Sequence, residues 1–550
     1  MIVSILVGAL ITFAILNIAF SLSDSATLSL YGLFIVCYLV LEMVFALRNR
    51  CKINKIRLGD ISDEHKDVGQ RVVNCVIAGY NEEADYYRAC LASFKNPAES
   101  PTTRIKHIFF IIDGLEADGQ GYMRDIFRDI YPDGKIIVLE HNLNNLNYHS
   151  LPIIEDDDKH ICIMQPHGGK REVLYSGFKL SINDTEVDAV MTSDSDTIID
   201  TNAVVELNNM FNDTRIGSAT GYVAIFNDES VISMMSRLRY FFASHMERAY
   251  ESFTGNVLCM SGPLSIYRTE IVSEFLDEWM NQKFLGKACT YGDDRHLTNH
   301  ILNRGYDTVF THHAKCITET PTTITRFLRQ QLRWNKSSAR EMGWTMKFVP
   351  DRSVWMTLDI TYQTLYSLFI FASIIYIVYA GTIDNIITYC YGLIIISVLR
   401  SLYGVIINGE LKYLLYSFYS VIYLSLMIPL RIFALVKLTD TSWGTTGRKM
   451  SDNALGEWAS VILWNLLIIS GLVKKIIEEV DDITSLQLYM LISIPSYFMS
   501  LYLIVAIYSR FKKHIYQKYP PLSNYLGLNV PELHQMYDID TPTGIQTSYV

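Results

Sequence analysis

Long apolar runs at both ends of the chain constrain its fold more than any other feature. Ile2 to Leu22 carries no charge and is long enough to cross a bilayer as a helix, and a second run, Ala26 to Leu47, follows almost at once. After about residue 355 the chain is hydrophobic again, whereas the middle reads as globular. Because 50% of all residues are hydrophobic and only 19% are charged, an ordinary soluble enzyme is disfavoured. We expect a globular domain set between membrane segments.

The residues around the N-terminal runs predict the orientation of the chain. A secretory signal peptide would begin with a basic stretch, which this chain lacks. The basic cluster RNRCKINKIR, residues 48–57, follows the second run, and such clusters mark the cytoplasmic side of a membrane. The part of the chain after residue 57 is therefore expected to be cytosolic.

Residues 58–320 alternate β-rich runs with helical stretches, which predicts an α/β domain. The expected strands are Val72–Ala78, His107–Ile112, Lys135–Glu140, Ala189–Ser193, Ala219–Phe226 and Thr308–Thr311. Several are apolar almost throughout, as in a parallel sheet covered by helices on both faces. Polar residues follow three of them: Tyr80 and Glu82, then Asp113, then Asp194 and Asp196. Ligands of open α/β sheets bind at the carboxyl ends of strands, so these residues predict one cleft.

The C-terminal block predicts four further crossings and one segment that does not cross. The expected helices are Trp355–Ala380, Ile386–Ile407, Leu411–Leu438, Trp458–Val473 and Leu486–Tyr508. The third holds Pro429, Arg431 and Lys437, which suit a bilayer centre poorly. If it crossed, the loop at 439–450 and the basic tail would both lie outside. We therefore expect six crossings in all, two of them within residues 1–47. The remaining parts are an interface segment at 321–354, membrane and interface helices over 355–510, and a cytosolic tail at 511–550.

Charge and cysteine usage exclude several classes of protein. A net charge of −10 argues against a nucleic-acid partner, which would require a basic face. The nine cysteines form no CxxC pair and show no zinc spacing. Free thiols in a reducing compartment are therefore expected.

The stretch MTSDSDTIID, residues 191–200, places two carboxylates one residue apart at the end of a predicted strand. Charges this close repel, and burying them is costly unless something positive lies nearby. Carboxylate oxygens are ligands that suit Mg²⁺ or Mn²⁺, and such an ion would offset both charges and hold a diphosphate. A solvated acidic turn would have the same sequence, so the motif alone leaves both interpretations open.

A glycine pair followed by two cations opens the helix that we expect to reach Ile182. Gly168 and Gly169 let the backbone approach a ligand, and a helix start attracts anions. Lys170 and Arg171 add positive charge at the same point. An ordinary basic helix start is the alternative.

The stretch TYGDDRHL carries two adjacent acids, Asp293 and Asp294, beside Arg295. A surface salt bridge would explain this arrangement. A catalytic base near a cationic site would explain it equally well. The residues themselves do not decide between the two.

The stretch QQLRW, residues 330–334, is more specific. In a helix, Gln330 and Trp334 fall on one face, one turn apart. An aromatic plane can hold a sugar ring, and Arg333 can bind phosphate or carboxylate with both arms of its guanidinium. The alternative is a tryptophan packed into a core next to the membrane.

Asp113, then DSD, then the acidic pair of GDDR, then QxxRW follow one another along the chain. This order resembles the processive inverting glycosyltransferases, which include cellulose, chitin and hyaluronan synthases. The stretches MSGPLSIYR (260–268), GDDRHLTN (292–299), QQLRWNKS (330–337) and WGTTGRK (443–449) are similar to class I hyaluronan synthases in particular. The resemblance covers nearly the whole chain. It implies a GT-A glycosyltransferase domain inserted between transmembrane helices, in an integral protein of the plasma membrane. The implied activity is the polymerisation of UDP-GlcNAc and UDP-GlcA into hyaluronan, with export of the growing polysaccharide.

The same resemblance implies a role for each motif residue. Asp294 matches the general base, and Asp194 and Asp196 would hold the nucleotide with Mg²⁺ or Mn²⁺. The other donor-binding roles fall on Tyr80, Glu82, Asp113, Lys170, Cys289, Arg333 and, from the mobile WGTTGR loop, Arg448. The acceptor-binding roles fall on Trp334, Gln330, Met260 and Cys259.

Independent chemical reasoning supports the reaction type. One carboxylate suffices as base for a single inverting displacement at the anomeric carbon, so an α-linked donor gives a β-linked product. Cations placed on the departing UDP stabilise its growing charge. Membrane lipid is an expected partner, and we take a monomer as the working state.

Three rival functions stay open at this point. A chitin-synthase-like enzyme would use UDP-GlcNAc alone. A non-processive transferase acting on a lipid carrier is disfavoured by QQLRW and the long C-terminal membrane block. A transporter with an inactive transferase domain would have no need for acids at 194, 196 and 294.

Overall fold

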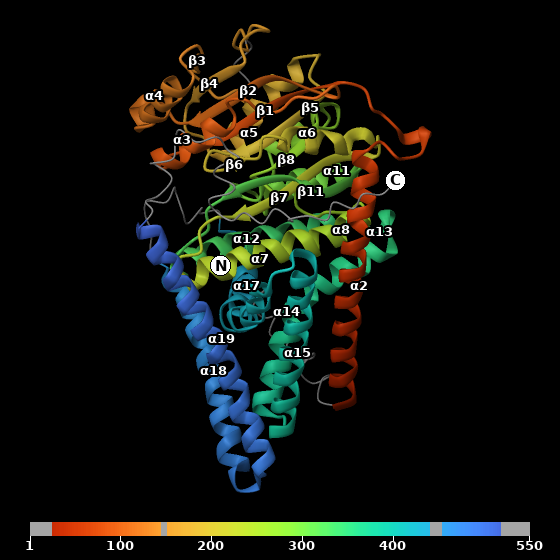
Figure 1. The fold of residues 1–550 in the computed structure, drawn as a ribbon, viewed down its shortest axis with the longest axis vertical. Coiled ribbons are helices and arrows are strands. Elements are labelled where there is room, and N and C mark those ends of the chain that lie inside the picture. Colours follow the sequence, from red (N-terminus) through yellow and green to blue (C-terminus); the bar gives the residue numbers. More distant parts are fainter. Residues whose placement is uncertain (1–24, 145–150, 441–453, 519–550) are drawn as a thin grey trace.

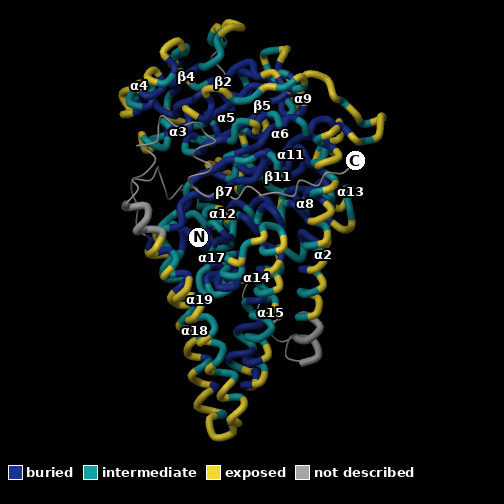
Figure 2. Tube along the Cα trace, viewed as in Figure 1, coloured by how far each residue is buried: buried dark blue, intermediate teal, exposed yellow. Residues whose placement is uncertain are grey.

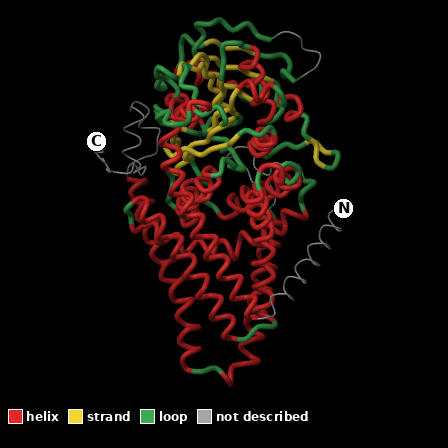
Figure 3. The backbone as a smooth tube through the Cα atoms, turned by 90° about the vertical axis from the view of Figure 1, so that its right-hand side faces the viewer, coloured by secondary structure: helices red, strands yellow, loops and turns green. Residues whose placement is uncertain are grey.

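The computed structural model describes residues 25–144, 151–440 and 454–518. They form an α/β domain joined to a bundle of long helices. The sheet and its covering helices lie at the top of Figure 1 and the long helices extend downward; Figure 3 shows the same separation from the side. The first predicted crossing, Ile2–Leu22, most of the loop at 439–450 and most of the tail at 511–550 fall outside the described residues.

A nine-stranded sheet with the order β3-β4-β2-β1-β5-β8-β7-β11-β6 forms the centre of the α/β domain. Its strands are β1 (Arg71–Gly79), β2 (Thr103–Asp113), β3 (Lys135–Val138), β4 (His160–Gln165), β5 (Ala189–Asp194), β6 (Ile198–Ile199), β7 (Ile216–Ile225), β8 (Ser265–Arg268) and β11 (Asp307–Thr318). All neighbours run parallel except where β8 meets β5 and β7, and where β6 meets β11. The predicted mostly parallel sheet is confirmed.

Alternate residues of the central strands enter two different cores, as the period of a β-strand requires. Cys75 and Phe110 belong to the core on one face of the sheet, and Val76 and Phe109 to the core on the other. Helices α3 (Ala84–Ser93), α4 (Gly121–Ile130) and α6 (Ala203–Asn208) cover the first face, and α5 (Lys170–Asn183) covers the second. Figure 2 shows the sheet as the most deeply buried part of the molecule.

Burial on both faces makes β1, β2, β5 and β7 recognisable from the sequence, and β3 is predicted although it is only partly buried. Strands β4, β6 and β8 are absent from the predicted set. The predicted Thr308–Thr311 is only the start of β11, whose polar HHAK stretch reads as a loop. Strand β8 has four residues and is held between β5 and β7 by pairing on both sides, which no local pattern reveals.

Helix α2 (Ser25–Arg57) runs from the membrane region into the α/β domain. The domain boundary predicted at residue 47 falls inside this helix. Its basic end docks on the domain: Lys52 Nζ donates to the carbonyl oxygens of Ser252 and Phe253 at 3.1 and 3.2 Å, and Arg57 pairs with Glu206. The basic cluster therefore lies at the domain end of the helix.

Six helical segments in the described part of the chain are long and apolar enough to cross a membrane. They include α14 (Val354–Tyr379), α15 (Ile383–Asn408), α18 (Leu455–Glu479) and α19 (Ser485–Lys518). Large apolar side chains stand exposed on these helices, among them Ile477 and Leu486. A contiguous apolar surface of this kind is disfavoured in water, which identifies an integral membrane protein.

The segment Leu411–Val436 also has the length and composition of a membrane span. It is nevertheless broken into the 3₁₀ helix η5 (Leu411–Phe418), α16 (Tyr419–Ile422), the π-helix η6 (Tyr423–Met427) and α17 (Ile428–Val436). It packs on α15 and on α12 (Ile324–Thr345), and in Figure 1 α17 lies just below α12 and α7 (Val231–Phe242). That it does not cross the membrane stays a prediction.

Candidate active site

The polar residues that follow β1, β2 and β5 lie at one edge of the sheet. These strands are neighbours in the order β2-β1-β5, and they run parallel. Tyr80 therefore stands between Asp113 and Asp194. The pKa of the Cys90 thiol is raised chiefly by burial and further by the charges of Asp196 and Glu82. Because both carboxylates act on the same thiol, they lie in the same region of the site. The polar residues after these three strands therefore lie along one edge of the sheet, as the sequence predicts.

Asp113 is held by the glycine pair that precedes α5. Its carboxylate accepts from the backbone N–H groups of Gly168 at 2.8 Å and Gly169 at 2.9 Å, and His167 Nδ1 lies 2.9 Å from Oδ2. Burial raises the pKa of Asp113, and these partners oppose the rise. The anion bound at this helix start is thus the protein's own carboxylate.

His167 is a site residue that the sequence analysis missed. Its ring stacks on Tyr80 with centroids 4.7 Å apart and planes 22° apart. It thereby links the end of β1 to Asp113 at the end of β2. The only sequence signal was its position directly before the glycine pair.

The DSD turn has the positive neighbour that its charges require. Ser195 N–H donates to the carbonyl of Ala78 at 3.1 Å, which fixes the turn against β1. The ammonium of Lys170 forms an ion pair with Asp194. Burial lowers the pKa of Lys170, but the carboxylates of Asp194, Asp293 and Asp294 outweigh it and the pKa is raised. Lys170 therefore carries its charge into the site.

Gly262, in the SGP stretch, lies against this ion pair. A Cβ there would stand 3.3 Å from Lys170 Nζ and 3.7 Å from Asp194 Oδ2. The absence of a side chain keeps space free beside the carboxylate.

This space and the two carboxylates fit a divalent ion. Among the described residues, no group of three or more His, Cys, Asp or Glu side chains could enclose a metal. Mg²⁺ typically takes one or two protein carboxylates and completes its shell with substrate phosphates and water. Asp194 and Asp196 therefore fit an ion that is bound together with a diphosphate.

The two acids of GDDR have separate partners. Gly292, at φ 84°, ends the preceding turn, and α11 (Asp293–Asn303) begins. Asp293 is buried and accepts from Arg171 Nε at 2.6 Å. Asp294 accepts from Cys259 Sγ at 3.3 Å and from its neighbour's backbone N–H at 2.8 Å. Asp293 is thus committed to an ion pair, whereas Asp294 faces the site.

Cys259 and Met260 attach the SGP segment to the helix of Asp294. Burial, and then the charge of Asp294, raise the pKa of the Cys259 thiol to about 12. The group is therefore a neutral thiol that donates to the carboxylate. Met260 is fully buried, and its backbone N–H donates to Thr298 Oγ1 at 3.0 Å.

QQLRW lies on α12, so the predicted helical face is confirmed. Trp334 is 37% exposed and meets Tyr240 edge to face at 6.2 Å, so part of its ring stands open to a ligand. Burial lowers the pKa of Arg333, and the carboxylates of Asp294, Asp194 and Asp293 oppose this shift. The first half of α12 therefore faces the same acids as Lys170.

Two predicted donor residues are not joined to this cluster. Cys289 is buried, and burial raises its thiol pKa; the charges that act on it most are those of Arg340 and Arg171. Arg340 lies on α12, and Arg171 on α5 is paired with Asp293. The contact of Cys289 with the donor therefore stays a prediction. Arg448 falls outside the described residues.

Comparison with known proteins decides the family. Residues 153–337 match the family described as Glycosyltransferase like family 2. The chain is 36% identical to hyaluronan synthase 1 of Xenopus laevis over 468 residues, covering 79% of this chain and 78% of the relative. It is 34% identical to hyaluronan synthase 2 of Rattus norvegicus, with 82% of each chain covered. This chain belongs to the hyaluronan synthases.

A hyaluronan synthase of this build is a membrane-embedded processive glycosyltransferase that makes hyaluronan. The chitin-synthase-like alternative is therefore not favoured. A solved structure, the mannosyltransferase PcManGT from Pyrobaculum calidifontis in complex with GDP-Man and Mn²⁺, aligns with 72% of this chain and 99% of its own. Its TM-score is 0.42 at 13% identity.

Proposed function

We propose that this synthase alternates UDP-GlcNAc and UDP-GlcA on the cytosolic side of the plasma membrane and exports the polymer through its own helices. One observation carries the proposal. Lys170 forms an ion pair with Asp194 at the carboxyl edge of the sheet, and the charges of Asp194 and Asp294 act on both Lys170 and Arg333. These groups would supply a base and cations for a diphosphate.

The donor would lie along the ends of β2, β1 and β5. The aromatic face of Tyr80, stacked on His167, and the carboxylate of Asp113 would hold the uridine. The diphosphate would draw Lys170 away from Asp194 and release that carboxylate. Asp194 and Asp196 would then hold Mg²⁺ or Mn²⁺, which when bound neutralises diphosphate charge.

Transfer would proceed by one displacement with inversion. Asp294 would accept the proton of the acceptor hydroxyl as that oxygen bonds to the anomeric carbon and the bond to UDP breaks. Cys259 keeps the carboxylate of Asp294 oriented through its thiol hydrogen bond. Arg333 and Lys170 would stabilise the negative charge that grows on UDP, and Arg448 would add to it from its loop.

The test of this function is to supply the nucleotide sugars to the purified protein singly and together. Radiolabelled polymer is expected only when both UDP-GlcNAc and UDP-GlcA are present. Digestion by a hyaluronan-specific hydrolase would identify the product. Polymer from UDP-GlcNAc alone would contradict the proposal and restore the chitin-synthase-like alternative.

The acceptor platform is tested by Trp334→Ala. This change removes the half-exposed ring but leaves the donor residues at the strand ends, so UDP-sugar binding should persist within about 3-fold. Polymer formation should fall by about 5- to 150-fold, because one stacked sugar is worth roughly 1–3 kcal/mol by analogy with aromatic stacking on bases. Full-length polymer at the wild-type rate would return Trp334 to a structural role. Tyr240→Phe, which keeps the neighbouring ring, is the control.

A further inference from the structure

The second half of α12 forms a buried polar contact with α11 that the proposed mechanism does not use. QQLRW occupies the first half of α12, whereas Arg340 and Glu341 lie one to two turns further on. Both side chains are buried, with Glu341 only 3% exposed. A buried carboxylate is costly unless it is well paired, so its partners indicate what it does.

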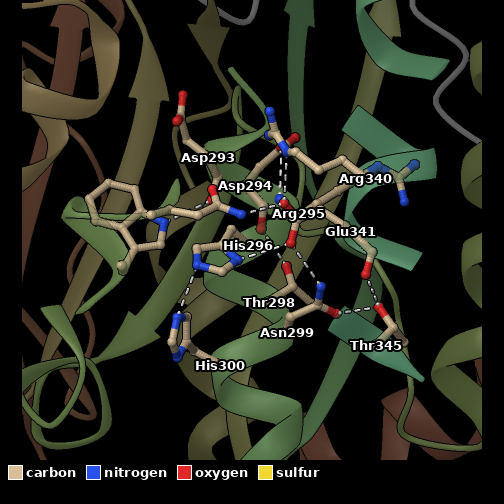
Figure 4. A network of polar contacts seen from close by, with 12 residues as sticks. Asp293, Asp294, Arg295, His296, Thr298, Asn299, His300, Arg340, Glu341 and Thr345 are labelled. Carbon is tan, nitrogen blue, oxygen red and sulfur yellow. Dashed lines mark hydrogen bonds and ion pairs between the residues drawn. The ribbon is translucent and has the colours of Figure 1, made fainter. Parts of the chain in front are cut away.

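Both oxygens of Glu341 are saturated by donors from three directions (Figure 4). Oε2 accepts from His296 Nδ1 at 2.9 Å and from Asn299 Nδ2 at 3.2 Å, both on α11. Oε1 accepts from Gln282 Nε2 at 2.7 Å and from Arg340 Nε at 3.3 Å. Burial raises the pKa of Glu341, but these donors outweigh it and bring the pKa to about 2. The group is therefore a carboxylate that ties α11 to α12.

A second contact fixes the point where α11 begins. Arg340 donates to the backbone carbonyl of Tyr291. A Cβ on Gly292 would stand 2.1 Å from Ser337 Oγ and 2.8 Å from Arg340 Nη2. The turn before α11 thus rests directly on α12, and Asp294 is the second residue of the helix that follows.

These contacts relate the base to the acceptor platform. His296 lies two residues after Asp294 on α11, and Glu341 lies seven residues after Trp334 on α12. Seven residues are about two helical turns, or roughly 10 Å along one side of a helix. Because a helix transmits position with little bending, a shift at Glu341 would move Trp334 relative to Asp294.

We propose that Glu341 is a positioning residue that fixes the carboxylate of Asp294 relative to the acceptor platform of Trp334. It does so through His296 and the α11–α12 contact, and it touches neither donor nor acceptor. The inference rests on the proposed roles of Asp294 and Trp334. A misplacement of about 1 Å in such a pair can cost about 100-fold in rate.

The test is Glu341→Gln, which keeps the shape of the side chain but turns an amide donor toward groups that already donate. We expect kcat for UDP release during synthesis to fall about 10- to 100-fold. The KM for each UDP-sugar should change less than about 3-fold, because the donor residues lie at the ends of β1, β2 and β5. A rise in KM at unchanged kcat would overturn the proposal.

A double-mutant cycle separates positioning from general destabilisation. If Glu341 acts through His296, the pair Glu341→Gln and His296→Ala should lower kcat no further than the more severe single change. If the fold-losses of kcat in the two single variants multiplied in the double variant, Glu341 would not act through His296. Gln282→Ala removes only one outer donor and should give a smaller fall in kcat in a protein that still folds. Gln282→Ala therefore tests the proposal even if Glu341→Gln folds poorly. An unchanged kcat in Gln282→Ala would overturn the proposal.

Glu206→Gln is the matched control. Glu206 is also a buried glutamate, paired with Arg57 at 2.5 Å, but it lies on α6 away from the site. It should lower the melting temperature without lowering kcat, and an equal loss of kcat would mean that Glu341 has no special role. The rate of UDP release by each variant is divided by the rate of the wild type. If the enzyme used other sugars than those proposed, the product would differ, but this ratio of rates would not change.

Discussion

Asp294→Asn is expected to lower hyaluronan synthesis at least about 100-fold while leaving UDP-sugar affinity nearly unchanged. The amide has the shape of the carboxylate and can still accept from Cys259, so the local structure should persist. It cannot accept the proton of the acceptor hydroxyl. UDP release measures turnover, and calorimetry with UDP measures binding. Both measurements are made on the same enzyme preparation.

Asp293→Asn is the control for this prediction. Asp293 pairs with Arg171, and both side chains are less than one tenth exposed. Removing one partner of a buried pair costs about 3–5 kcal/mol, so this variant should lose stability. Its folded fraction should retain far more turnover than Asp294→Asn. A collapse of UDP-sugar affinity in Asp294→Asn, with turnover otherwise intact, would make Asp294 a binding residue.

Asp196→Asn is expected to abolish polymer synthesis in a protein that still folds and purifies. EDTA should do the same to the wild type, and Mg²⁺ or Mn²⁺ should restore it. The reason is the donor set: two hard carboxylates beside an open space, with no third acid, His or Cys side chain among the described residues to complete a shell. Incorporation of labelled sugar into polymer is the measurement.

Asp200→Asn provides the control within the same acidic stretch. Asp200 Oδ1 accepts from the backbone N–H of Asn202 at 2.9 Å, a contact that an asparagine can also make. This variant should synthesise polymer at close to the wild-type rate. Normal turnover by Asp196→Asn, or by the wild type in EDTA, would refute the role of the DSD turn.

The parts of the fold that the sequence predicts are those with a strong local signal. β1, β2 and β5 are buried on both faces, so they appear as largely apolar runs, and the polar residues after them mark the site edge. The long apolar helices are recognisable for the same reason. Strands β6 and β8 are too short to give such a run and are formed because a neighbour pairs with them. Strand β4 does carry a short apolar run, Ile161–Met164, which the predicted set missed.

The candidate site divides in the same way. QQLRW carries residue types whose chemistry is specific and lies on a helix as predicted, and DSD lies at the end of the strand where it was predicted. The sequence could not separate Asp293 from Asp294, because adjacent acids look alike until one of them meets Arg171. It also suggested that the Gly168–Gly169 amides await a ligand, whereas they bind Asp113.

The sequence by itself therefore determined the class of this protein. Hydrophobic runs, which are local properties, indicated an α/β domain between membrane helices, and the resemblance carried by the motifs indicated sugar transfer. Only the tertiary structure decided which acid is committed to an ion pair, which histidine stacks on Tyr80, and how α11 meets α12 through Glu341. Each of these depends on contacts between residues that lie far apart in the chain. Such contacts form only when burial of the shared core brings their helices and strands together.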